Sequence, residues 1–373
     1  MHSRSRLDAG ETMTFLRARS GADALKAEQV RADDSRLAPI WQRLQSHGAI
    51  ESPFLTWEWF SSLADVPQLS RSMSVLVVSE CMEPVGLMPL EWNKGPGSLR
   101  TTGFPGWRWL APDHLDVVAT PEHREDVAGV VVRALGALRD WDMVDFDGLG
   151  RHAALSKALV RHMRFPRIIK RYCEDVAAPF VALHSANDRE LFPSRTLRQQ
   201  IRRGLRQSEQ AGGGFSVVSD ADEIVTHLEE LMKLHNERFG ARSAVFSTPA
   251  RRRFHRLAAH RLATADMARI YRLTAGGKDA ALLYALVFGD RVYYYSMGLR
   301  PITMSPGRTL LGQAIRSAAA EGFSEFDLLR GEHPFKQRIA NGTRQDLRRA
   351  YVRPTARTFM EAARRLTKGR GAR

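Results

Sequence analysis

The chain repeats one order of secondary-structure elements, and this repeat limits the folds open to it. Residues 122–140 have a helical pattern and lead into the apolar strand MVDFDGLG at 143–150. Residues 308–322 are again helical and lead into the strand FDLLRG at 326–331. Each strand carries an acidic residue among apolar ones and reaches a glycine turn. Alternating helices and strands predict an α/β (α+β) fold with two tandem halves, each a mixed twisted sheet flanked by helices.

The same patterns predict where the halves begin and end. We expect a variable segment over residues 1–35, an N-terminal half over 36–185, a C-terminal half over 186–353 and a basic tail over 354–373. The first 35 residues lack the apolar segment of a signal peptide, so we expect a partly disordered start and a cytoplasmic protein. In the second half the predicted elements are helices at 195–210, 222–236, 249–264 and 305–322, and strands at 215–218, 268–274, 280–289, 291–299, 325–330 and 346–352.

Charge and cysteine content restrict the partners. The net charge of +15 favours anionic ligands, which include phosphates, nucleic acid, acidic glycans and a membrane surface. Ten of these cations fall in residues 344–373, where we expect a solvated helix and tail; a nucleic-acid or peripheral membrane contact is the alternative. Cys81 and Cys173 lie far apart without a CxxC motif, which predicts no disulfide and no metal site.

The strongest ligand signal lies where a strand runs into a helix, in residues 293–322. Ser305 is a good N-cap, Pro306 suits the first helical position and Gly307 allows close backbone approach. The amides of residues 307–309 would then point outward at the positive end of the helix dipole, beside an arginine. This geometry predicts a phosphate site, and an ordinary capped helix is the alternative.

Residues 190–353 resemble the acetyltransferase-like domain of the GNAT superfamily, in particular CelD-type proteins linked to cellulose or exopolysaccharide synthesis. Fem-type peptidoglycan transferases, with two such halves in one chain, are similar more distantly. The segments that carry the resemblance are LRQQIRRGLRQSEQAGG, LHNERFG, YYYSMGLRP, SPGRTLLGQAI and FDLLRGEHPFKQR.

The resemblance implies that acetyl-CoA or another acyl-CoA lies in a cleft between splayed strands at 291–299 and 325–330. The residues it implies for donor binding are Met297, Gly298, Leu299, Arg300, Ser305, Gly307, Arg308 and Thr309. Two departures stand out. The phosphate loop contains only one glycine, Gly307, and Phe335 stands where relatives often have a tyrosine that protonates the thiolate.

Candidate catalytic and acceptor residues surround the proposed cleft. His333 and Glu332 are candidates for the base, because histidine titrates near neutral pH and a carboxylate can orient it; the alternative is that they cap the next helix. Asp327 is interpreted as part of a buried ion pair or hydrogen bond. For the acceptor we name His235, Glu237, Arg202 and Lys336.

These features predict an acyl-CoA-dependent N- or O-acyltransferase acting on an anionic sugar, glycan or cell-envelope precursor. Two alternatives stay open. One is a Fem-type transferase that uses aminoacyl-tRNA, the one nucleic acid expected as a partner. The other is a non-catalytic partner of the polysaccharide synthesis machinery.

Overall fold

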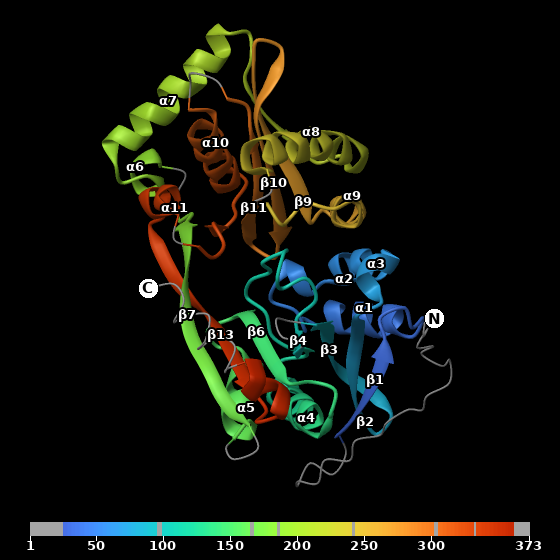
Figure 1. Cartoon of the computed structure of the whole chain (residues 1–373). Helices are drawn as coiled ribbons and strands as arrows, with labels where there is room; N and C mark the ends of the chain where they lie inside the picture. The colour runs from blue at the N-terminus through green and yellow to red at the C-terminus, as the bar shows by residue number, and fades with distance from the viewer. Residues whose placement is uncertain are drawn as a thin grey trace.

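The computed structural model describes residues 25–94, 99–164, 168–184, 187–240, 243–301, 305–331 and 333–361 (Figure 1). The strands in chain order are β1 (Leu25–Arg31), β2 (Met73–Glu80), β3 (Glu83–Lys94), β4 (Arg100–Gly103), β5 (Val118–Ala119), β6 (Met143–Leu149), β7 (Ile169–Ala182), β8 (Phe215–Val218), β9 (Ala268–Ala275), β10 (Lys278–Phe288), β11 (Arg291–Leu299), β12 (Glu325–Asp327) and β13 (Gly342–Val352).

Helices cover the faces of the sheet. They are α1 (Leu37–Ser46), the 3-10 turn η1 (Pro53–Leu55), α2 (Trp57–Ala64), α3 (Pro67–Ser70), α4 (Arg124–Ala137), α5 (Ala154–His162), α6 (Asp188–Leu191), α7 (Arg195–Gln210), α8 (Ala221–Phe239), α9 (Pro249–Thr264), α10 (Pro306–Ala320) and α11 (Pro334–Ile339). Within the described ranges, no helix combines the length and the hydrophobicity that a membrane crossing needs.

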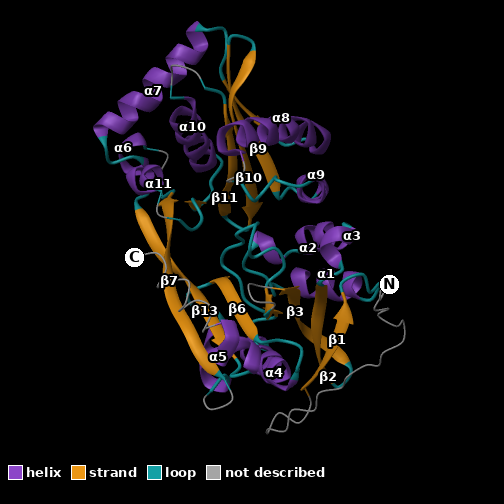
Figure 2. Cartoon of the chain, in the orientation of Figure 1, coloured by secondary structure: helices purple, strands orange, loops and turns teal. Residues whose placement is uncertain are grey.

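One continuous mixed sheet runs through both halves, as the strands in Figure 2 show. Its order is β1-β2-β3-β4-β6-β13-β7-β12-β11-β10-β9-β8, with β5 added to β3. Along this path only two pairs are parallel, β4 with β6 and β11 with β12. In each case a helix crosses between the two parallel strands, α4 in the first half and α10 in the second. The two halves therefore share one topology, and the predicted tandem fold is confirmed.

The long strands β7 and β13 are exchanged between the halves. β7 precedes every element of the second half in sequence, yet it pairs with β12. β13 follows every other strand of the second half, yet it pairs with β6 of the first half. The two exchanged strands also pair with each other over most of their length (Figure 1). Each of these two strands pairs with strands of both halves. The predicted boundary between the halves at residues 185 and 186 therefore stays a prediction.

The parallel pair β11–β12 is short, and this opens the sheet. Arg291 to Tyr293 pair with Glu325 to Asp327, and β12 then ends while β11 continues to Leu299. A bulge lies just past this point, because Tyr284 pairs with Ser296 and Ala285 with Tyr294, which leaves Tyr295 as the extra residue. From the bulge to its end at Leu299, β11 has no parallel neighbour, because β12 has already ended.

Aromatic packing joins the two halves on one face of the sheet. The ring of Trp59 in α2 lies 5.0 Å from Phe254 in α9 and 5.5 Å from Tyr295 in β11. Trp109 contacts Phe254 from the other side, with ring centres 5.7 Å apart. These rings are part of one hydrophobic core that extends over both halves.

The ends of the chain differ in part from the predictions. Residues 25–31, expected in a ragged start, form β1 and pair with β2 along their whole length. The strand predicted over residues 346–352 is present and begins earlier, at Gly342, as β13; its arginines are paired and not free in solvent, Arg348 with Asp145 at 2.8 Å and Arg344 with Glu325. Residues 356–361 are helical; residues 1–24 and 362–373 lie outside the described part.

Candidate functional site

A cavity of about 580 Å³ lies where β11 leaves its parallel neighbour. It is bounded by β11, by the start of α10, by α11 and by α7. Its lining residues are Ser194, Thr196, Leu197, Gln200, Arg238, Tyr294, Met297, Leu299, Ser305, Pro306, Gly307, Arg308, Leu311, Phe335, Arg338 and Ile339. The cleft wall that the sequence predicts from residues 325–330 is provided by α11 in its place, because β12 ends at Asp327.

The first turn of α10 opens into this cavity. A Cβ atom added to Gly307 would lie 3.0 Å from Leu299 and 3.2 Å from the sulfur of Met297, so a larger residue would crowd that wall. The amide of Thr309 donates to the carbonyl of Ser305 at 3.3 Å, which removes one of the three donors predicted for phosphate. The amides of Gly307 and Arg308 remain in the turn where a helix has no internal acceptors.

The charges around the cavity have one sign. Arg238, Arg308 and Arg338 line it, and the described lining residues include no carboxylate and no histidine. The Arg308 guanidinium donates to the side-chain carbonyl of Gln200 at 2.5 Å, which holds α7 against the rim. Apolar side chains make up most of the remaining wall. The cavity therefore suits a ligand with an anionic end and an apolar or weakly polar arm.

Tyr294 is a cavity residue that was not among the predicted site residues, because the sequence of three tyrosines at 293–295 was interpreted as strand packing. Tyr293 and Tyr295 belong to the core shared by the two halves, whereas Tyr294 faces the cavity from the opposite side of β11. Burial raises the pKa of Tyr294 far above its ordinary value, so the phenol stays protonated near neutral pH. The period of two along a strand places Tyr294 opposite its two neighbours, as the structure has it, but does not indicate which side holds the cavity.

Phe335 forms the edge of this cavity next to Tyr294. The two ring centres lie 5.9 Å apart, and Phe335 is 44% exposed. A ring on the solvent side of the cavity, without a hydroxyl, can pack on an apolar ligand arm but cannot donate a proton. Tyr294 thus places a phenol next to the Phe335 ring.

The predicted donor-binding residues are divided between the cavity and its supports. Met297, Leu299, Ser305, Gly307 and Arg308 line the cavity. The other three lie behind it: Gly298, Arg300 and Thr309. A Cβ at Gly298 would lie 2.8 Å from the carbonyl oxygen of Leu231, Arg300 pairs with Glu230 at 2.6 Å, and Thr309 is buried beneath α7.

The predicted acceptor residues are not brought together. His235 accepts or donates a 2.9 Å hydrogen bond with Ser243, and burial lowers its pKa, so the ring is neutral. Glu237 and Arg202 are exposed on α8 and α7. Lys336 is buried, and its ammonium donates to the carbonyl oxygens of Leu329 at 3.1 Å and Arg330 at 2.7 Å. Burial lowers the pKa of Lys336 to about 8.

The assignment of His333 and Glu332 as the catalytic base stays a prediction. His333 is exposed at the start of α11, with its ring 6.0 Å from that of Phe335 and outside the cavity lining. Glu332 lies outside the described residues. His333 is therefore one ring removed from the cavity lining.

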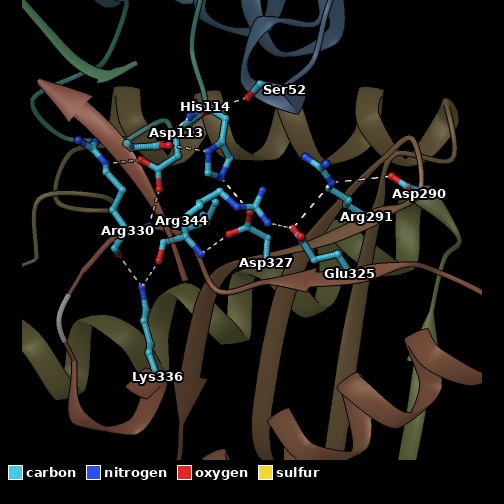
Figure 3. Close-up of polar contacts among 12 residues, drawn as sticks. Ser52, Asp113, His114, Asp290, Arg291, Glu325, Asp327, Arg330, Lys336 and Arg344 are labelled. Carbon is cyan, nitrogen blue, oxygen red and sulfur yellow. Dashed lines mark hydrogen bonds and ion pairs between the residues drawn. The ribbon is translucent and has the colours of Figure 1, made fainter. Parts of the chain in front are cut away.

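A buried network of charges lies at the end of β12 and joins the two halves (Figure 3). His114, from the first half, donates from Nε2 to Asp327 at 2.8 Å and from Nδ1 to Asp346 of β13 at 2.9 Å. Both carboxylates are almost fully buried. Burial alone lowers the pKa of His114, but the two carboxylates raise it well above its ordinary value, so the ring is an imidazolium.

Further ion pairs complete this network. Arg344 pairs with Glu325 and reaches Asp327 at 3.4 Å, while Arg330 pairs with Asp113 and Asp147. Burial raises the pKa of Asp113 to about 6 against the attraction of Arg330. The interpretation of Asp327 as a member of a buried ion pair is confirmed. Because Tyr293, beside Asp327, faces away from the cavity, the network supports the site from the other face of the sheet.

In the first half, β4 and β6 also pair at only two residues, Thr101 with Met143 and Thr102 with Val144. A small cavity of about 10 Å³ lies between α1, η1, α2 and the loop after β4, and its lining includes Trp41, Phe54, Trp59 and Phe104. No group of three or more potential ligands among the described residues is placed to hold a metal ion.

Comparison with known protein families gives a match to the part of the chain that surrounds this cavity. Residues 195–337, which contain α7, the first turn of α10 and most of α11, match the family described as Acetyltransferase (GNAT) domain. Over these residues the chain is similar to a GNAT acetyltransferase domain. Among curated proteins, no sequence matches the chain significantly.

Solved structures share the fold of nearly the whole chain. FemX is 11% identical, with a TM-score of 0.54, and the match covers 83% of this chain and 95% of that one. L-PGS from Bacillus licheniformis is 12% identical, with a TM-score of 0.55 and coverage of 89% and 96%. The C-terminal domain of a putative lysylphosphatidylglycerol synthetase from Agrobacterium fabrum is 14% identical, with a TM-score of 0.54 and coverage of 87% and 96%. At these identities the likeness establishes the fold alone.

Proposed function

We propose that the protein is an acyl-CoA-dependent acyltransferase that transfers an acyl group to an amine or hydroxyl of a sugar, polysaccharide or cell-envelope precursor. One observation carries the proposal. A donor-sized cavity opens where β11 leaves β12, with the α10 N-terminus and three arginines around it, and most of its lining belongs to the segment that matches an acetyltransferase domain. The CelD-type resemblance supports a glycan acceptor in exopolysaccharide or cellulose synthesis.

In this proposal, different residues of the cavity bind different parts of the acyl-CoA donor. The amides of Gly307 and Arg308 and the Arg308 guanidinium would take the pyrophosphate, since a helix N-terminus favours phosphate oxygens. The pantetheine arm would lie along Met297 and Leu299, where the backbone of β11 has no parallel neighbour. Leu197, Leu311 and Ile339 supply apolar contact around it.

The reaction would be a direct transfer. The acceptor nitrogen or oxygen forms a bond to the thioester carbonyl carbon, the C–S bond breaks, and CoA leaves as a thiolate. The protonated phenol of Tyr294 can donate a hydrogen bond to the charge that develops on oxygen or sulfur. His333, over the edge of Phe335, is our candidate to take the proton that the acceptor loses.

Calorimetric titration with acetyl-CoA tests the donor site. The wild type should bind it, and Gly307→Glu should abolish binding because it places bulk and negative charge against Leu299 and Met297. Ala320→Glu is the matched control: it adds the same side chain at the exposed far end of α10 and should bind like the wild type. Absence of binding by the wild type at millimolar ligand would refute the proposal.

A second candidate is transfer from aminoacyl-tRNA, favoured by the likeness to FemX over most of both chains. An aminoacyl ester offers the same carbonyl chemistry, and the arginines around the cavity suit its phosphates. Transfer of a labelled amino acid that requires tRNA would favour this candidate. CoA binding without turnover on any glycan acceptor would favour a non-catalytic partner of polysaccharide synthesis.

A further inference from the structure

Helix α7 carries exposed arginines whose charge is not neutralised by neighbours. Arginines on most other elements meet carboxylates; for example Arg256 pairs with Glu229 and Arg316 with Asp188. On α7 the exposed arginines are Arg195, Arg202, Arg203 and Arg206. Among the described residues, no carboxylate lies within ion-pair distance of these four. Four uncompensated cations on one helix of 16 residues form a concentrated positive surface.

Three of these arginines form a straight row. Arg195, Arg202 and Arg206 follow one another at seven and four positions, which places them on one side of a helix. At a rise of about 1.5 Å per residue, the row extends for about 16 Å. The buried side chains of the helix, which include Leu197 and Ile201, occupy the opposite side.

The row points away from the molecule because α7 is anchored by its other side. Gly204 lies so close to α10 that an added Cβ would be 1.9 Å from the Thr309 hydroxyl, and Gly312 of α10 makes similar room for Ile201. Figure 1 shows α7 along the outer edge of the second half. The row is thus presented on a convex edge and not inside a groove.

The rest of the exposed surface of α7 indicates how a partner would be held. It is made largely of uncharged polar residues, which include Gln199, Gln207 and Gln210, with Glu209 as the single acid of the helix. The helix contains no aromatic residue to stack on a nucleotide base and no exposed large apolar residue to insert into a bilayer. A partner would therefore be recognised by its negative charge over a flat area.

We propose that the arginine row of α7 docks the protein on an anionic phospholipid surface. A flat, repeated array of headgroup charges fits a straight convex row, whereas base stacking and the narrow major groove of an RNA helix do not. The same helix lines the cavity through Ser194, Thr196, Leu197 and Gln200, so docking brings the cavity opening close to the membrane. The proposal concerns binding alone and does not depend on the proposed transferase activity.

Co-sedimentation with phospholipid vesicles tests this docking surface. The wild type should bind vesicles that contain phosphatidylglycerol, should lose binding as salt is raised, and should not bind vesicles of phosphatidylcholine alone. The triple variant Arg195→Gln/Arg202→Gln/Arg206→Gln should bind roughly 100-fold more weakly, since each basic residue near an anionic surface is worth about fivefold in affinity. Glutamine keeps the helix, which circular dichroism can verify.

The matched control variant removes three positive charges from parts of the surface other than α7. Arg71, Arg161 and Arg253 are exposed on other elements, so their triple replacement by glutamine should leave vesicle binding close to that of the wild type. If the two triple variants lost vesicle affinity equally, net charge alone would explain the binding, and the proposal would be overturned. Unchanged binding by the α7 variant would also overturn it. Failure of the wild type to bind vesicles, together with loss of tRNA binding in the α7 variant, would show a nucleic-acid surface.

Discussion

Replacing His114 tests whether the buried charge network holds the two halves together. We choose His114→Asn, because His114 has a φ of +57° and asparagine tolerates this left-handed conformation. The shorter amide cannot reach both Asp327 and Asp346. The variant thus removes the shared cation and keeps the backbone, so that the change in stability reports the network.

The expected cost follows from the contacts that remain. Asp327 and Asp346 are 0% and 1% exposed, so neither carboxylate can recover solvation. Asp327 keeps the Leu329 amide at 2.7 Å and Arg344 at 3.4 Å, and Asp346 keeps the backbone amide of residue 114 at 3.0 Å. Removing one partner of a buried pair costs about 3–5 kcal/mol, and the remaining donors place this variant near the lower end.

The measurement is urea unfolding followed by tryptophan fluorescence over a range of pH. The pKa of His114 is lowered by burial but raised further by its carboxylates, so it is higher in the folded than in the unfolded chain. The stabilisation from the imidazolium is therefore complete below an unfolded pKa of about 6.5 and is lost as pH rises through the folded pKa. The difference in unfolding free energy between wild type and variant should shrink in alkaline solution.

A second variant distinguishes charge from packing. In the background Asp327→Asn, loss of the His114 cation should cost less, because a neutral amide needs no cation. A cost below about 1 kcal/mol, the range of exposed ion pairs, would contradict the assignment. So would a cost that neither alkaline pH nor Asp327→Asn reduces.

Three further variants test other parts of the structure. Tyr294→Phe should leave acetyl-CoA affinity unchanged in calorimetry and lower kcat by about 100-fold in a steady-state assay, if the phenol assists the transfer. Gly204→Val should lower the free energy of unfolding by about 1–3 kcal/mol in thermal denaturation, because its side chain would clash with Thr309. Phe254→Ala should cost about 3–5 kcal/mol in urea, since Phe254 packs between Trp59 and Trp109 where the halves meet. Equal kcat values, or unfolding curves that coincide with the wild type, would contradict the respective prediction.

The sequence predicted the second half well where local signals decide the structure. Helix α7 begins after Ser194, whose side chain caps it, and α9 begins after Thr248, which does the same; both helices have the predicted limits. Strand β11 also matches, because its apolar run is bounded by a turn and a loop. In such elements capping residues and periodicity carry the information within a few neighbouring positions.

Elements that depend on distant partners were not predicted. No element was assigned to residues 169–182, which form β7, because the segment includes a proline and several charges and lacks a regular alternation. Its strand conformation comes from pairing with β12 and β13 on its two sides. Similarly β12 ends at Asp327 and not at residue 330, since Leu329 has a φ of +58° beside the buried network.

In the candidate site, too, features set by neighbouring residues were predicted and features set by distant residues were not. The pattern around Ser305 and Gly307 correctly predicted the helix start that faces the cavity. The pairing of Asp327 with His114 could not be inferred, because the two residues come from different halves and no local pattern links them. The alternation along the strand placed Tyr294 opposite Tyr293 and Tyr295, but it could not show that this side of the sheet holds the cavity.

The exchange of β7 and β13 has a consequence for how the chain is made. During synthesis β6 and β7 leave the ribosome long before β13, which begins at Gly342, so each keeps an unpaired edge until the chain is almost complete. The first half therefore cannot finish its sheet as an independent unit, and folding waits for contacts between residues far apart in sequence. Such a chain exposes unpaired strand edges while it grows, and unpaired edges can pair with other chains.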